Sequence, residues 1–222
     1  MPIPEPLRDR IRAEAARGDM PIDVAVYEGA GMPPTEPLVC GSGSLTARIG
    51  FFGRDPGTHE VIHREPFIGA GGRILRDVLH ERLHGGAAPS VAAAREAGRS
   101  MFWANTVPYK PVGNKAWSVK VKRRFSPFIA ELLVDHWAGD QLITLGNVAL
   151  DWFRFEAPHE KDRLAAFAKR DDRYGESLTI TLRDKAITLH PLPHPSPLNA
   201  AWYRKVPDLL RARLDALGWP PA

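Results

Sequence analysis

The sequence is poor in cysteine and has no long apolar run. Cys40 is the single cysteine among 222 residues, which excludes an internal disulfide framework and any zinc or iron–sulfur site ligated by several cysteines. No apolar run approaches the roughly 18 residues that a membrane-spanning helix needs. Segment 1–18 lacks the apolar core of a secretory signal. We therefore expect a cytoplasmic protein from a reducing compartment, without membrane association.

A strong excess of charge of one sign is also absent. Lysine and arginine number 30 against 26 acidic residues, a net charge of +4 that permits an anionic partner without identifying one. Glycine and proline, by contrast, are abundant at 19 and 21 residues, which predicts many shaped loops. A hydrophobic share of 44% excludes a disordered chain, and the length suits a single domain over 1–222.

Strand-like and helix-like patterns alternate along the chain. Short apolar or β-rich stretches predict strands at 47–53 and 141–146, a strand that runs out into a loop over 101–109, and a pair within 178–190. Helical spacing predicts helices at 4–17, 72–83, 126–137, 147–155 and 202–217, the third of them starting at Ser126-Pro127 and the last with Pro207 as a kink or a second start. Segments 29–43 and 158–173 are expected to be irregular and solvated, respectively. The alternation predicts an α/β fold, a three-layer α/β/α sandwich with a short, mainly parallel central sheet.

Three loops follow predicted strands, where ligand sites of such folds gather: 53–72, 104–115 and 191–199. In the first, Asp55 comes directly after a strand, held by Pro56 between two glycines. A carboxylate there could activate water or stabilise a cation. The alternative is an Asx-turn, in which the carboxylate caps the N–H groups of its own loop.

The same loop matches a zinc-protease pattern. His59-Glu60-Val61-Ile62-His63 has the H-E-x-x-H order, in which two histidines one helical turn apart bind metal and the glutamate acts as base. That chemistry needs a helix, which Val61 and Ile62 disfavour in so short a segment. We therefore predict no metal site, with a metalloprotease kept as a minor alternative.

The second loop combines an amide with positive charge. Asn105 ends a predicted strand, and its amide suits recognition of the edge of an amide-like base, although a turn-forming asparagine is the alternative. Segment 110–124 holds Trp117 and six basic residues without an acidic one, which suits contact with a phosphate backbone as well as a plain solvated surface. The six are Lys110, Lys115, Lys120, Lys122, Arg123 and Arg124.

The third loop is the most distinctive of the three. Four prolines within 191–197 predict a rigid segment that presents His194 and Ser196 without an ordering cost on binding. Leu198, apolar at the tip of the loop, is either a residue of the core or a wedge for a stacked duplex. A histidine between prolines has little purpose in secondary structure, which favours a functional role for His194.

Together these segments resemble the uracil-DNA glycosylase superfamily. GRDPG (53–57) resembles its first motif, EPFIGAGG (65–72) the element that follows in one branch, and ANTVPYKPVGN (104–114) the strand end that bears an asparagine. LGNVAL (145–150) is similar to its next strand-to-helix turn, and HPSPLN (194–199) is very close to its histidine motif. The resemblance spans about 47–205. The branch stays open, because the chain has Gly57 where one branch has tyrosine and lacks the four cluster-binding cysteines of another.

The resemblance implies a role for each matched residue. Asp55 and His194 would be catalytic, orienting water and hydrogen-bonding uracil O2. Gly53, Gly57, Phe67 and Asn105 would form the substrate pocket, with Phe67 stacking on the base and Asn105 recognising its N3–O4 edge. The contacts to DNA would come from Ser196, Leu198, Asn114 and Lys115.

The implied protein is a monofunctional uracil-DNA glycosylase of base excision repair. It would need no cofactor, act as a monomer on single- or double-stranded DNA that contains uracil, and associate with the nucleoid in a bacterium. A protein that binds damaged or abasic DNA with little turnover is the alternative.

Overall fold

One sheet of six strands is present in the computed structural model, which describes residues 3–38 and 42–220, so that Cys40 lies outside the described residues. The strand order is β1-β3-β2-β4-β6-β5, and the neighbours β3, β2, β4 and β6 run parallel while β1 and β5 pair antiparallel at the two edges. The strands are β1 (Ser42–Gly43), β2 (Ile49–Gly53), β3 (Phe102–Asn105), β4 (Gln141–Leu145), β5 (Leu178–Leu182) and β6 (Lys185–Leu192).

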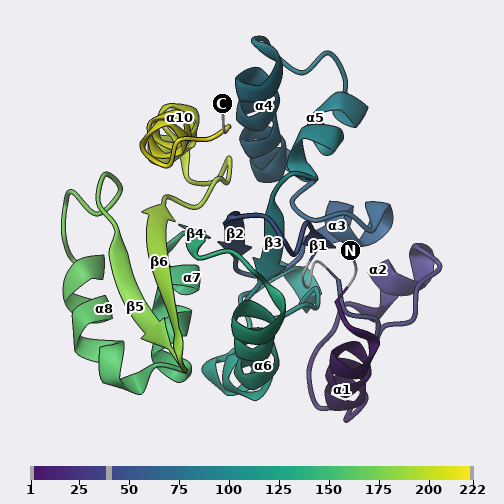
Figure 1. Ribbon diagram of the computed structural model, residues 1–222. Coiled ribbons are helices and arrows are strands. Elements are labelled where there is room, and N and C mark those ends of the chain that lie inside the picture. Colours follow the sequence, from purple (N-terminus) through teal and green to yellow (C-terminus); the bar gives the residue numbers. More distant parts are fainter. Residues whose placement is uncertain (1–2, 39–41, 221–222) are drawn as a thin grey trace.

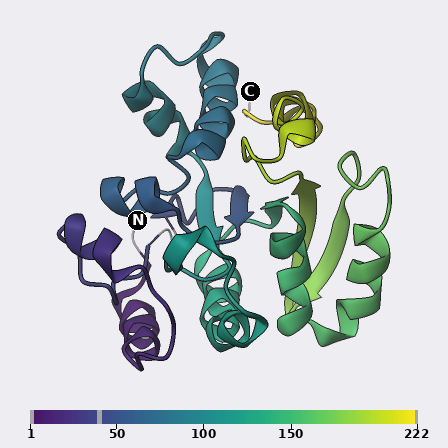
Figure 2. The ribbon, with the colours of Figure 1, turned by 180° about the vertical axis from the view of Figure 1, so that it is seen from behind.

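Helices cover both faces of this sheet (Figures 1 and 2). The helices of the described residues are α1 (Glu5–Ala15), α2 (Val24–Gly29), α3 (Thr58–His63), α4 (Ala70–His84), α5 (Val91–Gly98), α6 (Val119–Glu131), α7 (Asn147–Asp151), α8 (Lys161–Ala168), α9 (Ala200–Tyr203) and α10 (Val206–Ala216). Among them, no helix is long and apolar enough to cross a membrane.

Two apolar clusters on opposite faces of the sheet make up the core. On one face Phe51 of β2 packs with buried residues of α4, α5 and α10, and on the other its neighbour Phe52 packs with residues of α6, α7 and α8. Successive side chains of a strand point to opposite faces, so an entirely apolar strand such as β2 must be covered on both sides. The predicted three-layer α/β/α fold with a mainly parallel sheet is confirmed.

The parallel strands deliver their carboxyl ends to one edge of the sheet. Gly53 at the end of β2 pairs in register with Asn105 of β3, and Leu145 of β4 pairs with Leu192 of β6. The chain passes from β2 to β3 on one side, whereas β4 and β6 lie on the other. Loops after β2 and β4 therefore diverge, and a crevice forms at such a switch point.

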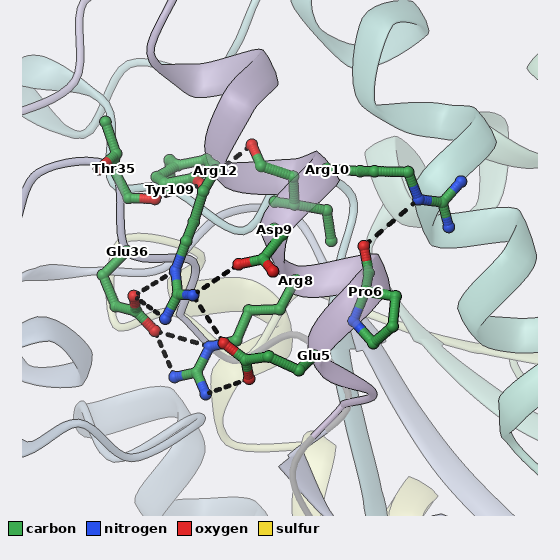
Figure 3. A network of polar contacts seen from close by, with 10 residues as sticks. Glu5, Pro6, Arg8, Asp9, Arg10, Arg12, Thr35, Glu36 and Tyr109 are labelled. Carbon is green, nitrogen blue, oxygen red and sulfur yellow. Dashed lines mark hydrogen bonds and ion pairs between the residues drawn. The ribbon is translucent and has the colours of Figure 1, made fainter.

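The N-terminal helix is bound to the segment that follows β3 through a polar network (Figure 3). Arg8 and Arg12 of α1 both contact the carboxylate of Glu36, with Arg12 Nε at 2.8 Å from Oε2. The hydroxyl of Tyr109 donates to the carbonyl of Thr35 at 2.7 Å. Segment 106–111, which follows Asn105, is thereby held from outside the sheet.

The predicted start of one helix at Ser126-Pro127 is wrong. Helix α6 begins at Val119, where Ser118 Oγ accepts a hydrogen bond from the N–H of Val121 at 3.3 Å, and Pro127 lies inside it. Because proline has no N–H, the carbonyl of Arg123 loses its usual helical donor. The Ser126 hydroxyl donates to that carbonyl at 3.1 Å, which lets the helix continue through the proline.

Other boundaries also depart from the sequence predictions. Segment 158–173 is not merely solvated, since α8 buries Leu164 and Phe167. For segment 202–217, the second start at Pro207 is the alternative found, because α9 ends at Tyr203 and α10 begins at Val206; Trp202, expected in the core, is only half-buried. Segment 29–43 ends in the short edge strand β1. Short helices α2 and α5 have no counterpart in the predictions.

Candidate active site

A cavity of about 760 Å³ opens at the edge of the sheet where the parallel strands end. Its walls come from the loop after β2, the first turn of α4 and the loop after β6. Most of the predicted site residues line it, namely Gly53, Asp55, Gly57, Phe67, His194, Ser196 and Leu198. The fold thus brings together residues that lie up to 145 positions apart, from Gly53 to Leu198.

Asp55 is a buried carboxylate in the cavity wall. Its side chain is 1% exposed and forms an ion pair with Arg54, whose Nε lies 2.9 Å from Oδ2. Burial raises the pKa of Asp55 from 3.8 to about 6, and the positive charges of Arg54 and Lys122 oppose that rise. In an Asx-turn the N–H of Gly57 would bind Asp55, but it donates to Glu60 Oε2 at 2.9 Å. The loop therefore has a different cap, and the carboxylate is left for other partners.

Phe67 lies across the base of the cavity in an unusual backbone conformation. Its φ of +48° is in the left-handed region, which costs a residue other than glycine about 1 to 3 kcal/mol. Its ring packs so closely on Gly53 that a Cβ there would come within 2.5 Å of it, and it lies 5.1 Å from the ring of Trp103. Glycine at position 53 is therefore required for the aromatic ring to sit at the end of β2.

Asn105 lies behind Gly53 and does not itself line the cavity. Its side chain is buried, with the amide nitrogen 3.6 Å from where a Cβ on Gly53 would stand. Within residues 3–38 and 42–220, the amide oxygen Oδ1 has no hydrogen-bond partner. A buried acceptor without a donor is costly, so such groups are found where a ligand or water completes the site.

His194 stands at the mouth of the cavity on the rigid loop that the prolines predict. The carbonyl of His194 accepts hydrogen bonds from the N–H of Ser196 at 2.8 Å and from Asn199 Nδ2 at 3.3 Å. Gly146, after β4, packs on it so closely that a Cβ would lie 2.9 Å from His194 Cβ. The ring is exposed at the mouth, yet the surrounding loops remove enough hydration to lower the pKa of His194, and the charge of Arg54 lowers it further. The imidazole is therefore neutral at pH 7 and can donate a hydrogen bond.

Leu198 is 98% exposed at the tip of this loop, so it is not a residue of the core. Its N–H donates to Ser196 Oγ at 3.3 Å, which fixes the turn beneath the apolar side chain. A fully exposed leucine on a rigid turn at the rim of a polar cavity is the arrangement that a wedge residue requires.

The first turn of α4 and the histidine loop touch backbone to backbone. A Cβ on Gly71 would lie 1.8 Å from the carbonyl oxygen of Pro195, an overlap that only movement of the loop could relieve. We expect Gly71→Ala to lower the free energy of unfolding by about 1 to 3 kcal/mol, measured by urea denaturation. Gly29→Ala, in a helix with open space at that position, is the matched control and should change it by less than about 1 kcal/mol. Equal stability of the two variants would contradict this close packing.

The H-E-x-x-H segment does form a helix, α3, contrary to expectation. The rings of His59 and His63 are parallel with centroids 6.3 Å apart. Glu60, however, accepts hydrogen bonds from the N–H groups of Gly57 at 2.9 Å and Gly69 at 3.3 Å. Its carboxylate therefore joins the start of α3 to the start of α4. In the part of the chain that the structure describes, no three histidine, cysteine or acidic residues are grouped to hold a metal ion.

Part of the basic segment 110–124 is internal, which corrects its interpretation as one surface. Lys110 is buried with its Nζ 2.7 Å from Asp23, and Arg124 contacts Glu14 and Asp19. Trp117 is also buried and donates to the carbonyl of Tyr109 at 2.8 Å. The exposed cations of the segment are Lys115, Lys120 and Arg123. Asn114 belongs to the turn Val112–Asn114, and its side chain lies outside the described part of the structure.

Sequence reasoning missed three side chains around the site: Arg54, Glu60 as a backbone cap, and Arg76. Arg76 of α4 is 1% exposed, and its guanidinium contacts the segment that holds Phe67. The signal was present, since Arg76 shares the buried helical stripe of Leu75 and Leu79. A charged residue on such a stripe is buried on folding, so it needs hydrogen-bond partners from elsewhere in the chain.

Comparison with known proteins agrees with this geometry. The family model of the uracil DNA glycosylase superfamily matches residues 40–218, well over half of the chain. A search of curated proteins gave no match. Members of the superfamily are glycosidases that act on DNA in base excision repair, which supports a hydrolase that binds DNA. On the extent of this match, the chain belongs to the uracil DNA glycosylase superfamily.

Proposed function

We propose that this protein hydrolyses the N-glycosidic bond of uracil in DNA, working on a nucleotide flipped out of the strand and leaving an abasic site. The observation that carries the proposal is the meeting of Asp55 and His194 in one cavity, from the ends of different strands. Asp55 is buried and His194 stands at the mouth, so the two can act on opposite sides of a nucleotide that enters between them.

Entry of the nucleotide requires that it leave the base stack, at a cost of a few kcal/mol. Leu198, which is exposed at the rim, would fill the vacated space, and the hydroxyl of Ser196 and the exposed Lys115 would contact flanking phosphates. Each of these groups lies outside the buried part of the cavity. Asn114, beside Lys115, is assigned to the same DNA contact on sequence grounds.

Recognition of the base falls to Phe67 and Asn105. The ring of Phe67 offers a flat apolar surface on which a base stacks. Asn105 lies behind Gly53, so a base that reaches the end of β2 would bring its N3–H to the unpartnered Oδ1 of Asn105 and its O4 to Nδ2. Cytosine presents the reverse pattern of donor and acceptor on that edge, and a buried mismatch of this kind is strongly disfavoured. Gly57 has no side chain beside Asp55 in the cavity wall. The carboxylate of Glu60 occupies part of that space, because a Cβ on Gly57 would lie 2.6 Å from Glu60 Oε2.

Bond cleavage transfers the electron pair of the glycosidic bond to uracil. The sugar C1′ then carries positive charge and uracil becomes an anion, as in glycoside hydrolysis. The neutral imidazole of His194 donates a hydrogen bond to the developing charge on O2. The Asp55 carboxylate balances the charge on the sugar and accepts the proton of the water whose oxygen bonds to C1′.

An oligonucleotide with one uracil provides the test. The protein is incubated with it in EDTA and the product is heated in alkali, which breaks the strand only at abasic sites. Breaks at uracil, with none in matched strands that carry thymine or cytosine, support the proposal. A tight gel shift without breaks would instead favour a protein that binds damaged DNA. If neither breaks nor a shift were observed, the proposed reaction would have no support.

Leu198 gives a prediction on strand preference. Because it is 98% exposed, Leu198→Ala should leave the melting temperature unchanged. On duplex DNA we expect the single-turnover rate to fall about tenfold, equivalent to ~1.4 kcal/mol, since the vacated stack is no longer filled. On single strands, which need little unstacking, the rate should change less than twofold. The same loss on both substrates would contradict a wedge role.

A further inference from the structure

We infer that Arg76 is a positioning residue that holds Phe67 in place as the surface on which the flipped base stacks, an inference that rests on the function proposed above. Arg76 lies in the second turn of α4 and is 1% exposed. It does not line the cavity, so any effect on the reaction must pass through other residues. A buried guanidinium is costly unless its donors are satisfied, and its partners therefore show what it organises.

The guanidinium of Arg76 binds Phe67 and the two residues that precede it. Its Nε donates to the carbonyl of Phe67 at 3.1 Å, and its Nη2 donates to the carbonyl of Pro66 at 2.5 Å and to Glu65 Oε1 at 2.9 Å. Three consecutive residues thus share one planar group. A fourth contact, from Nη1 to the carbonyl of Arg95 at 3.0 Å, joins this arrangement to α5.

Phe67 needs such support because its backbone is strained. Its φ of +48° lies in the left-handed region, which is unfavourable for a residue with a side chain. One turn before Arg76 on α4, Gly72 is so close to the Phe67 carbonyl that a Cβ there would lie 1.7 Å from the oxygen. The Phe67 carbonyl is therefore held against α4 at two positions, and neither contact depends on the ring that faces the cavity.

Aromatic packing extends the same support to the ring. The guanidinium carbon of Arg76 lies 4.9 Å from the ring centroid of Trp103, which in turn lies 5.1 Å from the ring of Phe67. Trp103 is fixed by a hydrogen bond from Nε1 to the carbonyl of Gly98 at 2.7 Å. Gly98 has no room for a side chain, because a Cβ would come within 2.1 Å of Arg76 Nη1. Arg76, Trp103 and Phe67 therefore form one packed unit behind the base pocket.

Lysine cannot replace this arrangement, although it keeps the charge. Arginine spreads its donors over a flat fork that reaches several acceptors at once, whereas an ammonium group directs all its donors from one atom. Arg76→Lys should consequently fold while releasing some of the carbonyls of 66, 67 and 95. It is the variant to test, since a neutral replacement would leave Glu65 without its partner.

A double-mutant cycle tests whether Arg76 acts through Phe67. Single-turnover rates on single-stranded uracil DNA are measured for the intact protein, Arg76→Lys, Phe67→Ala and the double variant. We expect Arg76→Lys to lower the rate about tenfold in the intact background and less than twofold in the Phe67→Ala background. Equal losses in both backgrounds, or no loss on Phe67→Ala alone, would overturn the inference.

Arg213 supplies the matched control. It is another buried arginine whose Nη2 donates to backbone carbonyls, those of Tyr174 at 3.1 Å and Glu176 at 2.7 Å, and it is remote from the cavity lining. Arg213→Lys should lower the melting temperature about as much as Arg76→Lys does, and it should leave the single-turnover rate within twofold of that of the intact protein. A similar rate loss in this variant would assign the effect of Arg76 to stability alone.

Hydrogen exchange separates this inference from the proposed function. The N–H groups of Glu65 and Gly69 are both bound to Glu60, so their exchange reports on the segment that carries Phe67. Arg76→Lys should speed exchange there at least tenfold, and Arg213→Lys should not. Faster exchange in a protein that does not cleave uracil DNA would reject the proposed function and keep the positioning role. Unchanged exchange would reject the positioning role whatever the activity.

Discussion

Replacing Asp55 with asparagine is expected to slow uracil release by about 10²- to 10⁴-fold, the usual contribution of general acid–base catalysis. Asparagine keeps the size of the side chain but neither balances the positive sugar nor accepts a proton from water. The measurement is the single-turnover rate on a uracil oligonucleotide. Intact activity of this variant would exclude the role assigned to the carboxylate, even if the protein is a glycosylase.

The same substitution should stabilise the folded protein at pH 7. The pKa of Asp55 is about 6 in the folded state against an ordinary 3.8, so the folded state holds its proton more tightly than the unfolded state. Stability is therefore unaffected below pH 3.8, falls as the pH rises from 3.8 to 6, and stays lower above that range. A difference of about two pKa units corresponds to ~3 kcal/mol.

Urea unfolding at two pH values measures this effect. Asp55→Asn should be more stable than the natural protein by about 2 to 3 kcal/mol at pH 7 and by much less at pH 4. The natural protein should also lose activity below about pH 6, where Asp55 takes up its proton. A stability difference that does not depend on pH would show that burial of the charge is not its cause.

If both effects are found, they would explain why a carboxylate lies in a nearly dry wall of the cavity. Charge that is poorly solvated before the reaction interacts strongly with the charge that develops on the sugar. Arg54 limits the cost, since its ion pair with Asp55 favours the ionised form. At neutral pH the folded protein is therefore less stable than it would be with a neutral group there, and it holds an ionised carboxylate at the centre of the proposed reaction.

Local patterns in the sequence located the loops that surround the cavity. Asp55, Phe67, His194 and Leu198 were all identified from short motifs, and the predicted sheet placed them at one edge. This worked because glycine and proline determine loop geometry through their own backbone restrictions. That Leu198 is not a residue of the core became clear only from its exposure in the folded chain, and its wedge role stays a prediction.

Interactions between distant segments could not be predicted in this way. Lys110 looks like a surface cation until Asp23, from the N-terminal part of the chain, pairs with it. Arg76 looks like an ordinary helical arginine until its carbonyl partners fold against it. In each case the deciding partner is set by tertiary structure rather than by neighbouring residues.

His194 gives the second large expected effect. Removing its imidazole in His194→Ala should slow uracil release by about 10²- to 10³-fold, because a preorganised donor to the developing charge on O2 is lost. Its ring is exposed at the mouth of the cavity, so the melting temperature should change little. The rate is measured at pH 7, where the imidazole is neutral because loss of hydration to the surrounding loops and the charge of Arg54 lower the pKa of His194.

The protonation state makes a second variant informative. If His194 acts as a neutral donor, His194→Gln should recover part of the lost rate, since a glutamine amide also donates without a charge. If His194 instead acted as a cation, glutamine would rescue nothing, and the natural protein would gain activity as the pH fell toward the pKa of the imidazole. The lowered pKa of His194 favours the first case, because it keeps the donor neutral at pH 7, where Asp55 with its pKa of about 6 is still ionised. Rescue by glutamine would therefore support a neutral donor at position 194, while the loss of activity below about pH 6 tests the ionised Asp55 opposite it.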